Sequence, residues 1–118
     1  MLIAWDGSEA VSATMSAAIP LLKLASEVRL FCVERAGTGT DPSEAATYLS
    51  RHGIHADLKR AYDLQHSVAK VIDNECERWG AHWCLMGAYG HSRLREALFG
   101  GVTRQMLTDS NVPLVLGH

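Results

Sequence analysis

The chain has 118 residues, 47% hydrophobic and 20% charged, which is the composition of one soluble globular domain with a single core. Its formal net charge of −2 argues against a general nucleic-acid binder, which would be basic. Because it has no apolar run of membrane-spanning length, no secretory pattern and no CxxC pair among its three cysteines, we expect a cytoplasmic protein.

The N-terminal part of the chain predicts a strand, a helix and a second strand. The apolar run of residues 2–5 stops at an Asp-Gly-Ser turn, which is typical of a buried first strand. Asp6 or Ser8 can cap the helix that follows, whose apolar residues recur at helical spacing. Pro20 should kink this helix or end its regular part, and residues 28–33 form the second strand.

The middle of the chain predicts a helix, an edge strand and a further helix. Residues 41–44, Asp-Pro-Ser-Glu, are a helix start with a capping Asp and Pro in the first helical position. This helix ends near Gly53, and residues 54–60 alternate weakly, as expected for a third strand at an edge. Asp63 can cap the next helix, which closes at Gly80.

The C-terminal part predicts a buried strand, a glycine-rich loop, a helix and a last strand. The fourth strand is the apolar run of residues 82–86, followed directly by Gly-Ala-Tyr-Gly at 87–90. A second glycine pair at 100–101 precedes a helix expected over 103–110. Residues 112–116 form the fifth strand, and the proline within it favours an outer position in the sheet.

Strands that alternate with helices predict a parallel sheet with right-handed crossovers and helices on both faces. Five strands in one domain, residues 1–118, fit a three-layer α/β sandwich of flavodoxin-like type with strand order 3-2-1-4-5. In such a sheet a ligand lies beyond the carboxyl ends of the strands where the winding reverses, here between the first and fourth. Asp6 ends the first strand and Gly87 ends the fourth, so both turns should meet at this crevice.

The glycines after the fourth strand follow the pattern G-x2-G-x9-G-G, beginning at Gly87. Glycine lets a ligand approach the main chain closely, and a helix start directs unpaired N–H groups at an anion. The P-loop motif is absent, and the turn after the first strand lacks the dinucleotide fingerprint. A phospho-receiver would need an acid at the end of the third strand, where Lys59 and Arg60 stand. The sequence therefore predicts a nucleotide or phosphate site of another kind.

With these motifs the chain resembles the universal stress protein family over its whole length, and it is similar to the second half of tandem members. The resemblance lies in residues 3–8, 86–92, 100–103 and 112–116. It implies an adenine nucleotide alpha hydrolase-like fold, ATP binding, dimers built on the last strand, and a role in stress tolerance or signalling. One position departs from the pattern of the nucleotide-binding branch: Gly101 stands where that branch has Ser or Thr.

The resemblance also implies which residues contact the nucleotide. Asp6 would face the ribose or adenine, Val33 would offer main-chain contacts to adenine, and the glycines would line the ribose and phosphate path. Thr103, at the expected helix start, would be the hydroxyl nearest to Gly101. The full implied set is Ala4, Asp6, Gly7, Ser8, Val33, Met86, Gly87, Gly90, His91, Gly100, Gly101, Val102 and Thr103.

We expect ATP as the ligand, with AMP and ADP as alternatives and with Mg²⁺ accompanying ATP. Hydrolysis should be slow at most, since neither a water-activating base nor the Lys and Arg apparatus of fast phosphoryl transfer is evident, and we assign no catalytic residue. The histidines show no metal-ligand spacing, so we expect no protein-held metal, and no nucleic-acid or membrane partner either. Two other interpretations stay open: a nucleotide-free dimerisation or interaction module that pairs through residues 112–116, and a weak ATPase that acts as a timer.

Overall fold

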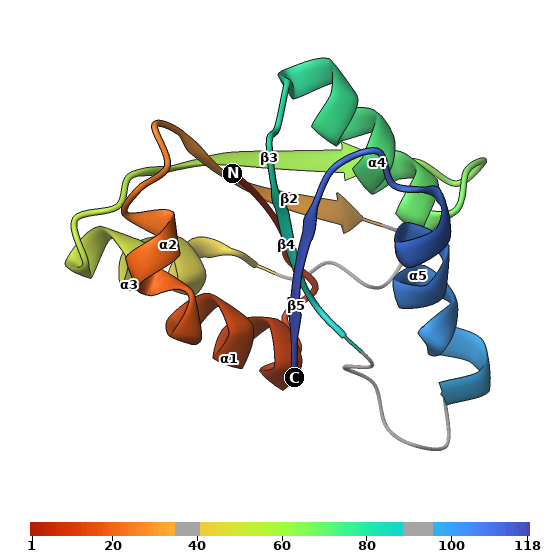
Figure 1. The fold of residues 1–118 in the computed structure, drawn as a ribbon, viewed down its shortest axis with the longest axis horizontal. Coiled ribbons are helices and arrows are strands. Elements are labelled where there is room, and N and C mark those ends of the chain that lie inside the picture. The colour runs from red at the N-terminus through yellow and green to blue at the C-terminus, as the bar shows by residue number, and fades with distance from the viewer. Residues whose placement is uncertain (35–40, 89–95) are drawn as a thin grey trace.

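The computed structural model describes residues 1–34, 41–88 and 96–118, with side chains described for all of these except residues 96–100. The described residues form a five-stranded sheet of order β3-β2-β1-β4-β5, in which every neighbouring pair is parallel (Figure 1). The predicted fold class and strand order are thus confirmed. The strands are β1 (Leu2–Ala4), β2 (Val28–Glu34), β3 (Ala56–Tyr62), β4 (Cys84–Gly87) and β5 (Leu114–Gly117).

Helices cover both faces of the sheet, with α1, α2 and α3 on one side and α4 and α5 on the other (Figure 1). They are α1 (Glu9–Ala17), α2 (Ile19–Leu22), α3 (Ser43–Arg51), α4 (Val68–Trp79) and α5 (Glu96–Asp109). The core therefore has two halves: Ile3 packs toward α1 and α3, whereas Leu2 and Ala4 pack toward α4 and α5. A strand buried on both faces has no polar side, which explains why β1 is uniformly apolar.

Single residues explain where α1 begins and where it ends. Ser8, not Asp6, is its N-cap, and the Ser8 hydroxyl accepts a hydrogen bond from the Val11 N–H at 3.1 Å. The regular helix ends at Ala17, and α2 restarts with Pro20 in its first turn, where a missing N–H costs least. The prediction that Pro20 interrupts this helix is confirmed.

Glycines pack α1 tightly onto the ends of β4 and β5. A Cβ on Gly87 would lie 2.7 Å from the Val11 backbone nitrogen, and one on Gly117 would lie 2.6 Å from the Thr14 hydroxyl. Real Cβ atoms do not come that close to other heavy atoms. Glycine at the ends of both strands therefore lets α1 rest directly on the sheet.

Two local predictions need correction. Ser67 caps α4 through the Lys70 N–H, because Asp63 lies too far before the helix and instead accepts from the Gln65 and His66 N–H groups. The last helix starts at Glu96 rather than at residue 103, so Gly100 and Gly101 lie inside it. A pair of glycines favours a break in a helix, but α5 runs without interruption through Gly100 and Gly101.

The remaining boundaries shift by one or two residues. Pro42 directly precedes α3 instead of being its first residue, β3 runs from Ala56 rather than from residue 54, and β5 begins just after Pro113. β3 lies at one edge of the sheet and β5 at the other, as predicted. In the part of the chain that the structure describes, no helix combines the length and apolar character needed to cross a bilayer.

Candidate functional site

The carboxyl ends of β1 and β4 lie side by side at the point where the strand order reverses. Ala4 pairs with Met86 in the parallel register, so the chain leaves both strands at the same level of the sheet. Hydrogen bonds continue the sheet past both strands, from the Trp5 N–H to the Phe31 carbonyl at 2.9 Å and from the Ala88 N–H to the Gly117 carbonyl at 2.7 Å. The two strand ends therefore lie side by side, where an open parallel sheet is expected to have its ligand crevice.

The turn after β1 is held by its own polar groups. The Asp6 carboxylate accepts a hydrogen bond from the Ser8 N–H at 2.9 Å, and Gly7 has a φ of 76°, in the left-handed region that favours glycine. Asp6 and Gly7 are exposed, and α1 begins directly after Ser8. This geometry places an exposed carboxylate and a helix N-terminus at the mouth of the crevice.

Three apolar residues lie on one face of the sheet at this crevice. Ala4 and Met86 are buried in the half of the core that faces α4 and α5, and the half-buried Val33 packs against the same half from the end of β2. The sequence analysis expected all three to contact the nucleotide, with Val33 at the adenine. They belong to the same half of the core, on the neighbouring strands β1, β2 and β4.

The glycine of β4 has a structural reason that does not involve a ligand. The backbone of α1 packs closely on Gly87, since a Cβ added there would meet the Val11 nitrogen at 2.7 Å and the Ala10 Cβ at 3.0 Å. Any side chain at this position would push α1 away. Gly87 is therefore required by the fold, whether or not a nucleotide lies above it.

The residues expected at the phosphate end are less well assembled. Gly90 and His91 lie outside the described residues, and Gly100 and Gly101 lie within α5 rather than ahead of it. Gly101 is exposed, and a Cβ added there would have nothing within 4 Å. The expectation that the helix begins at Val102 and Thr103 is wrong, because α5 begins at Glu96.

The two residues after Gly101 point toward the protein rather than the solvent. Val102 is half-buried and packs against the core half of α4 and α5, and Thr103 is only 3% exposed. The hydroxyl of Thr103 is therefore shielded, whereas Gly101 is open to solvent. The glycine motif could not predict that Gly101 is exposed and Thr103 buried, because it does not specify where the helix starts.

The groups near the crevice do not form a reactive centre. Burial raises the pKa of the Cys32 thiol, next to Val33 on β2, to about 11, so the thiol is neutral near pH 7. Within residues 1–34, 41–88 and 96–118 no group of three or more His, Cys, Asp or Glu side chains is placed to hold a metal ion.

Comparisons with known proteins find solved structures that have the same fold. No protein-family model and no curated protein matches the chain. Among solved structures, a universal stress protein from Archaeoglobus fulgidus is 17% identical, with a TM-score of 0.74 over 99% of this chain and 96% of that one. A universal stress protein family member from Burkholderia pseudomallei is 18% identical, with a TM-score of 0.65 over 98% and 93%.

A third solved structure is a universal stress protein in complex with cAMP, 12% identical, with a TM-score of 0.73 over 99% of this chain and 94% of that one. A different Archaeoglobus fulgidus universal stress protein matches 98% of this chain with only 42% of its own length. At these identities the likeness establishes the fold. The chain has the fold of the universal stress protein structures.

Proposed function

We propose that the chain is a universal stress protein that binds an adenine nucleotide, ATP above all, at the crevice between β1 and β4. The observation that carries this proposal is the pairing of Ala4 with Met86, which brings the turn at Asp6 beside Gly87 where the strand order reverses. Ligands of open parallel sheets bind at such a point. The sequence pattern and the fold favour the same place for different reasons.

The half-buried side chain of Val33, with the buried Ala4 and Met86 on the neighbouring strands, is suited to one face of an adenine ring. Nucleotide pockets are mostly apolar, with a few polar groups that fix the orientation of the ligand. Asp6 follows Ala4 by two residues. Its exposed carboxylate can accept a hydrogen bond from a ribose hydroxyl. A solved universal stress protein of the same fold is in complex with cAMP, which shares the adenosine portion with ATP.

The phosphates would run from Gly87 and Gly90 toward α5. The unpaired N–H groups of α5 belong to its first turn, which starts at Glu96. Gly100 and Gly101 follow one turn later, where the lack of side chains leaves the helix backbone open to a phosphate. Mg²⁺ would be held mainly by the nucleotide, because the described residues offer no carboxylate cluster.

Calorimetric titration with ATP, ADP, AMP and cAMP tests the proposal directly. We expect saturable binding of ATP, and the absence of heat and of any thermal shift at millimolar ATP would contradict nucleotide binding. Mass spectrometry of any nucleotide retained through purification would identify the preferred adenylate. In the same samples we expect ATP turnover to be slow or absent, because the sequence shows no evident water-activating base.

Gly101 allows a sharper test with a matched pair of variants. A side chain at this position meets no atom within 4 Å, so Gly101→Ser and Gly101→Ala should both fold normally. If phosphate passes this point, the serine hydroxyl adds a charge-assisted hydrogen bond, and Gly101→Ser should bind ATP about tenfold more tightly than Gly101→Ala. Equal affinities of the two variants would exclude a phosphate at position 101.

A second candidate function is a nucleotide-free dimerisation or interaction module. It is favoured by the lack of a hydroxyl at Gly101 together with the burial of Thr103, and by the open edge of β5. Failure of every adenine nucleotide to bind, combined with self-association in solution, would support this function over the first.

A further inference from the structure

Two of the three cysteines lie against each other in the core, on the side of the sheet that α4 and α5 cover. Cys76 belongs to the last turn of α4, and Cys84 is the first residue of β4. The two residues are 1% and 0% exposed and belong to the same half of the core. The Cys84 thiol donates a hydrogen bond to the Cys76 sulfur, so the two side chains are in direct contact.

The short connection between α4 and β4 keeps this pair together. The Cys76 carbonyl accepts hydrogen bonds from the Gly80 N–H at 3.0 Å and from the Ala81 N–H at 2.8 Å. Gly80, with a φ of 77°, ends the helix in the left-handed conformation, and the chain then leads directly into β4 (Figure 1). Cys84 is held in turn by pairing of β4 with β1 and with β5. The backbone on both sides therefore keeps the two thiols next to each other.

The hydrogen bond makes the two thiols chemically different. It lowers the pKa of Cys76 against the opposing effect of burial, and together with burial it raises the pKa of Cys84 well above its usual value. The thiolate, rather than the thiol, is the nucleophile in cysteine oxidation. Cys76 is therefore the thiol that reacts first, and Cys84 is placed beside it to react second. Cysteines that respond to peroxide commonly have such a second thiol next to them.

A small oxidant can reach Cys76 through the end of α4. The two residues that follow it, Glu77 and Arg78, are exposed, and so is Gly80. The last turn of a helix frays at far less free energy than global unfolding requires. Opening of this one turn would expose the Cys76 sulfur while the sheet stays intact.

We propose that Cys76 and Cys84 form a reversible disulfide when the protein meets hydrogen peroxide. The Cys76 sulfur attacks one peroxide oxygen, so that an S–O bond forms, the O–O bond breaks, and the departing hydroxide takes up a proton to become water. The Cys84 sulfur then attacks the Cys76 sulfur, the S–O bond breaks, and the departing hydroxide takes the Cys84 proton as a second water. The two thiols lose two electrons, and these reduce one peroxide to two waters.

The disulfide suits the place where it forms. It is uncharged and fits an apolar core, whereas further oxidation of Cys76 to a sulfinate would bury a charge. Bond formation shortens the distance between the sulfurs from a hydrogen-bond contact to about 2.05 Å, a movement that a frayed last turn can make. Because Cys84 begins β4, the bond lies at the amino end of the strand, away from the crevice at the carboxyl ends. The proposal is therefore independent of nucleotide binding.

Peptide mapping of the full reduced chain after treatment with hydrogen peroxide tests the proposal. Free thiols are alkylated before digestion, and trypsin cuts after Arg78, so a disulfide between Cys76 and Cys84 joins two peptides that otherwise separate. We expect this linked pair in the folded protein, lighter by two hydrogen atoms, and its loss after dithiothreitol. Cys32 is the internal control, because β1 separates it from β4 and its thiol is neutral near pH 7. It should be oxidised at least about tenfold more slowly than the pair.

Variants separate the two steps of the reaction. Cys84→Ala removes the second thiol, so peroxide should leave on Cys76 a sulfenic acid that dimedone traps, and no disulfide should form. Cys32→Ala is the matched control and should form the same disulfide as the wild type. Circular dichroism checks that both variants are folded. In the wild type itself, unlinked peptides after peroxide treatment, or oxidation of Cys32 as fast as that of the pair, would overturn the proposal.

Discussion

Gly87 and Gly101 belong to the same glycine pattern, yet they have opposite surroundings. Gly87 is pressed against the backbone of α1, whereas Gly101 is exposed on α5 with open space beside it. The first glycine is required for packing, and the second is not. A motif that counts both as ligand contacts therefore mixes two different physical causes.

Alanine at each position should change stability in opposite directions. We expect Gly87→Ala to lower the free energy of unfolding by about 1–3 kcal/mol, because its methyl group would overlap α1. We expect Gly101→Ala to raise it by about 0.5–1 kcal/mol, because glycine is unfavourable within an exposed stretch of helix. Urea unfolding without nucleotide measures both, and a Gly87→Ala protein as stable as wild type would contradict the close packing of α1.

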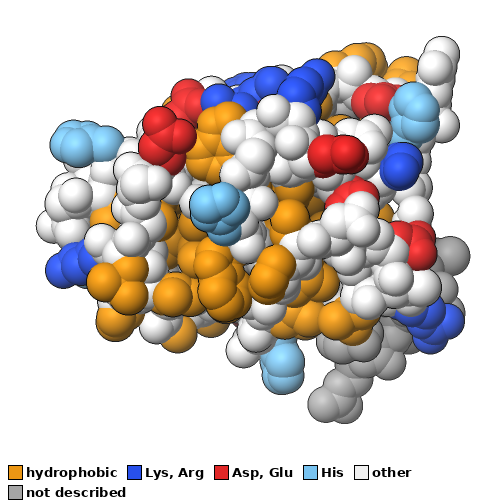
Figure 2. All heavy atoms as spheres, turned by 45° about the horizontal axis from the view of Figure 1, so that its top comes forward, with side chains coloured by type: hydrophobic (Ala, Val, Ile, Leu, Met, Phe, Trp, Pro, Cys, Tyr) orange, Lys and Arg blue, Asp and Glu red, His pale blue; other side chains and the backbone are white. Residues whose placement is uncertain are grey.

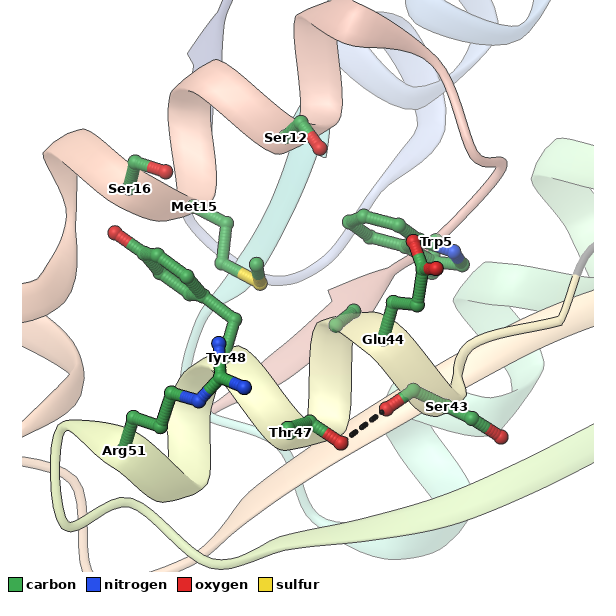
Figure 3. Close-up of a pocket in the computed structure, with 10 residues that line it drawn as sticks. Trp5, Ser12, Met15, Ser16, Ser43, Glu44, Thr47, Tyr48 and Arg51 are labelled. Carbon is green, nitrogen blue, oxygen red and sulfur yellow. Dashed lines mark hydrogen bonds between the residues drawn. The ribbon is translucent and has the colours of Figure 1, made fainter.

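The turn at Asp6 shows how far residue-level prediction reaches. The sequence indicated that Asp6 or Ser8 caps α1, and the structure assigns the cap to Ser8, with Asp6 bonded to the Ser8 N–H. The convergence of this turn with Gly87 was predictable from strand order alone. The hollow that Trp5 and Tyr48 line (Figure 3) could not be predicted, because these two residues come from separate elements and no spacing in the sequence connects them.

At the scale of the element, α4 is tied to the sheet by a buried carboxylate. Glu75 is 1% exposed and accepts hydrogen bonds from Arg29 on β2 at 2.8 Å and from Arg78 within α4, with the Lys59 ammonium on β3 at 3.0 Å. Arg29 also pairs with Asp57 at 2.5 Å and stacks on Trp79 at 4.6 Å. Charges from three elements thus converge on one side chain.

This network makes a pH-dependent contribution to stability. Burial alone would raise the pKa of Glu75, but hydrogen bonds from Arg78, Lys59 and Arg29 outweigh it and leave the pKa below its usual value. The folded state therefore holds the Glu75 proton less tightly than the unfolded state. The stabilisation is complete above the ordinary glutamate pKa of about 4.3 and is lost as the pH falls through the lowered value.

We expect Glu75→Gln to reduce the free energy of unfolding by about 1–3 kcal/mol near pH 7, because a buried partner of three cations loses its charge. The two proteins should converge in stability as the pH falls through the lowered pKa of Glu75, because Glu75 itself then becomes neutral. Denaturant unfolding from pH 3 to pH 7 measures the difference. A gap that stayed constant with pH would show that folding does not lower the pKa of Glu75.

The helix boundaries show where prediction from sequence stops. Apolar runs ended by Asp or Gly predicted β1, β4 and β5, because a buried parallel strand needs a continuous apolar stretch, whereas β3 was predicted from a weak alternation. The start of α5 was missed, because a glycine pair weakens a helix without excluding one. Asp63 was predicted to cap α4, whereas Ser67 is the cap. The two residues are easily confused, because the turn at Asp63 and the cap at Ser67 lie close together in sequence.

At the scale of the whole molecule, the two edges of the sheet differ in character. At β3, Arg60 pairs with Glu34 at 3.1 Å and with Asp41 at 3.4 Å, and charged edges discourage strand pairing. β5 instead carries the apolar Leu114, Val115 and Leu116, each half-buried. Figure 2 shows one face of the molecule, where Lys and Arg side chains gather at the upper border and hydrophobic side chains spread across the lower half.

We propose that two copies of the chain pair through β5, as the sequence analysis expected for residues 112–116. The exposed Trp83 adds apolar surface beside it, since the next residue, Cys84, donates its N–H to the Pro113 carbonyl. Val115→Glu should give monomers in analytical ultracentrifugation, whereas Leu58→Glu on the opposite edge strand should not. Circular dichroism confirms that both variants are folded, and a Val115→Glu dimer would place the interface elsewhere.

The seating of α1 on Gly87 and Gly117 has an evolutionary consequence. The two glycines meet consecutive turns of α1, Gly87 at Ala10 and Val11 and Gly117 at Thr14. A larger residue at either glycine becomes tolerable only if α1 shifts outward, and such a shift would also loosen the contact at the other. Among homologous sequences these positions should therefore diverge together rather than singly. At position 101 no neighbouring atom restricts the side chain, so only contact with a ligand would restrict which residue is found there.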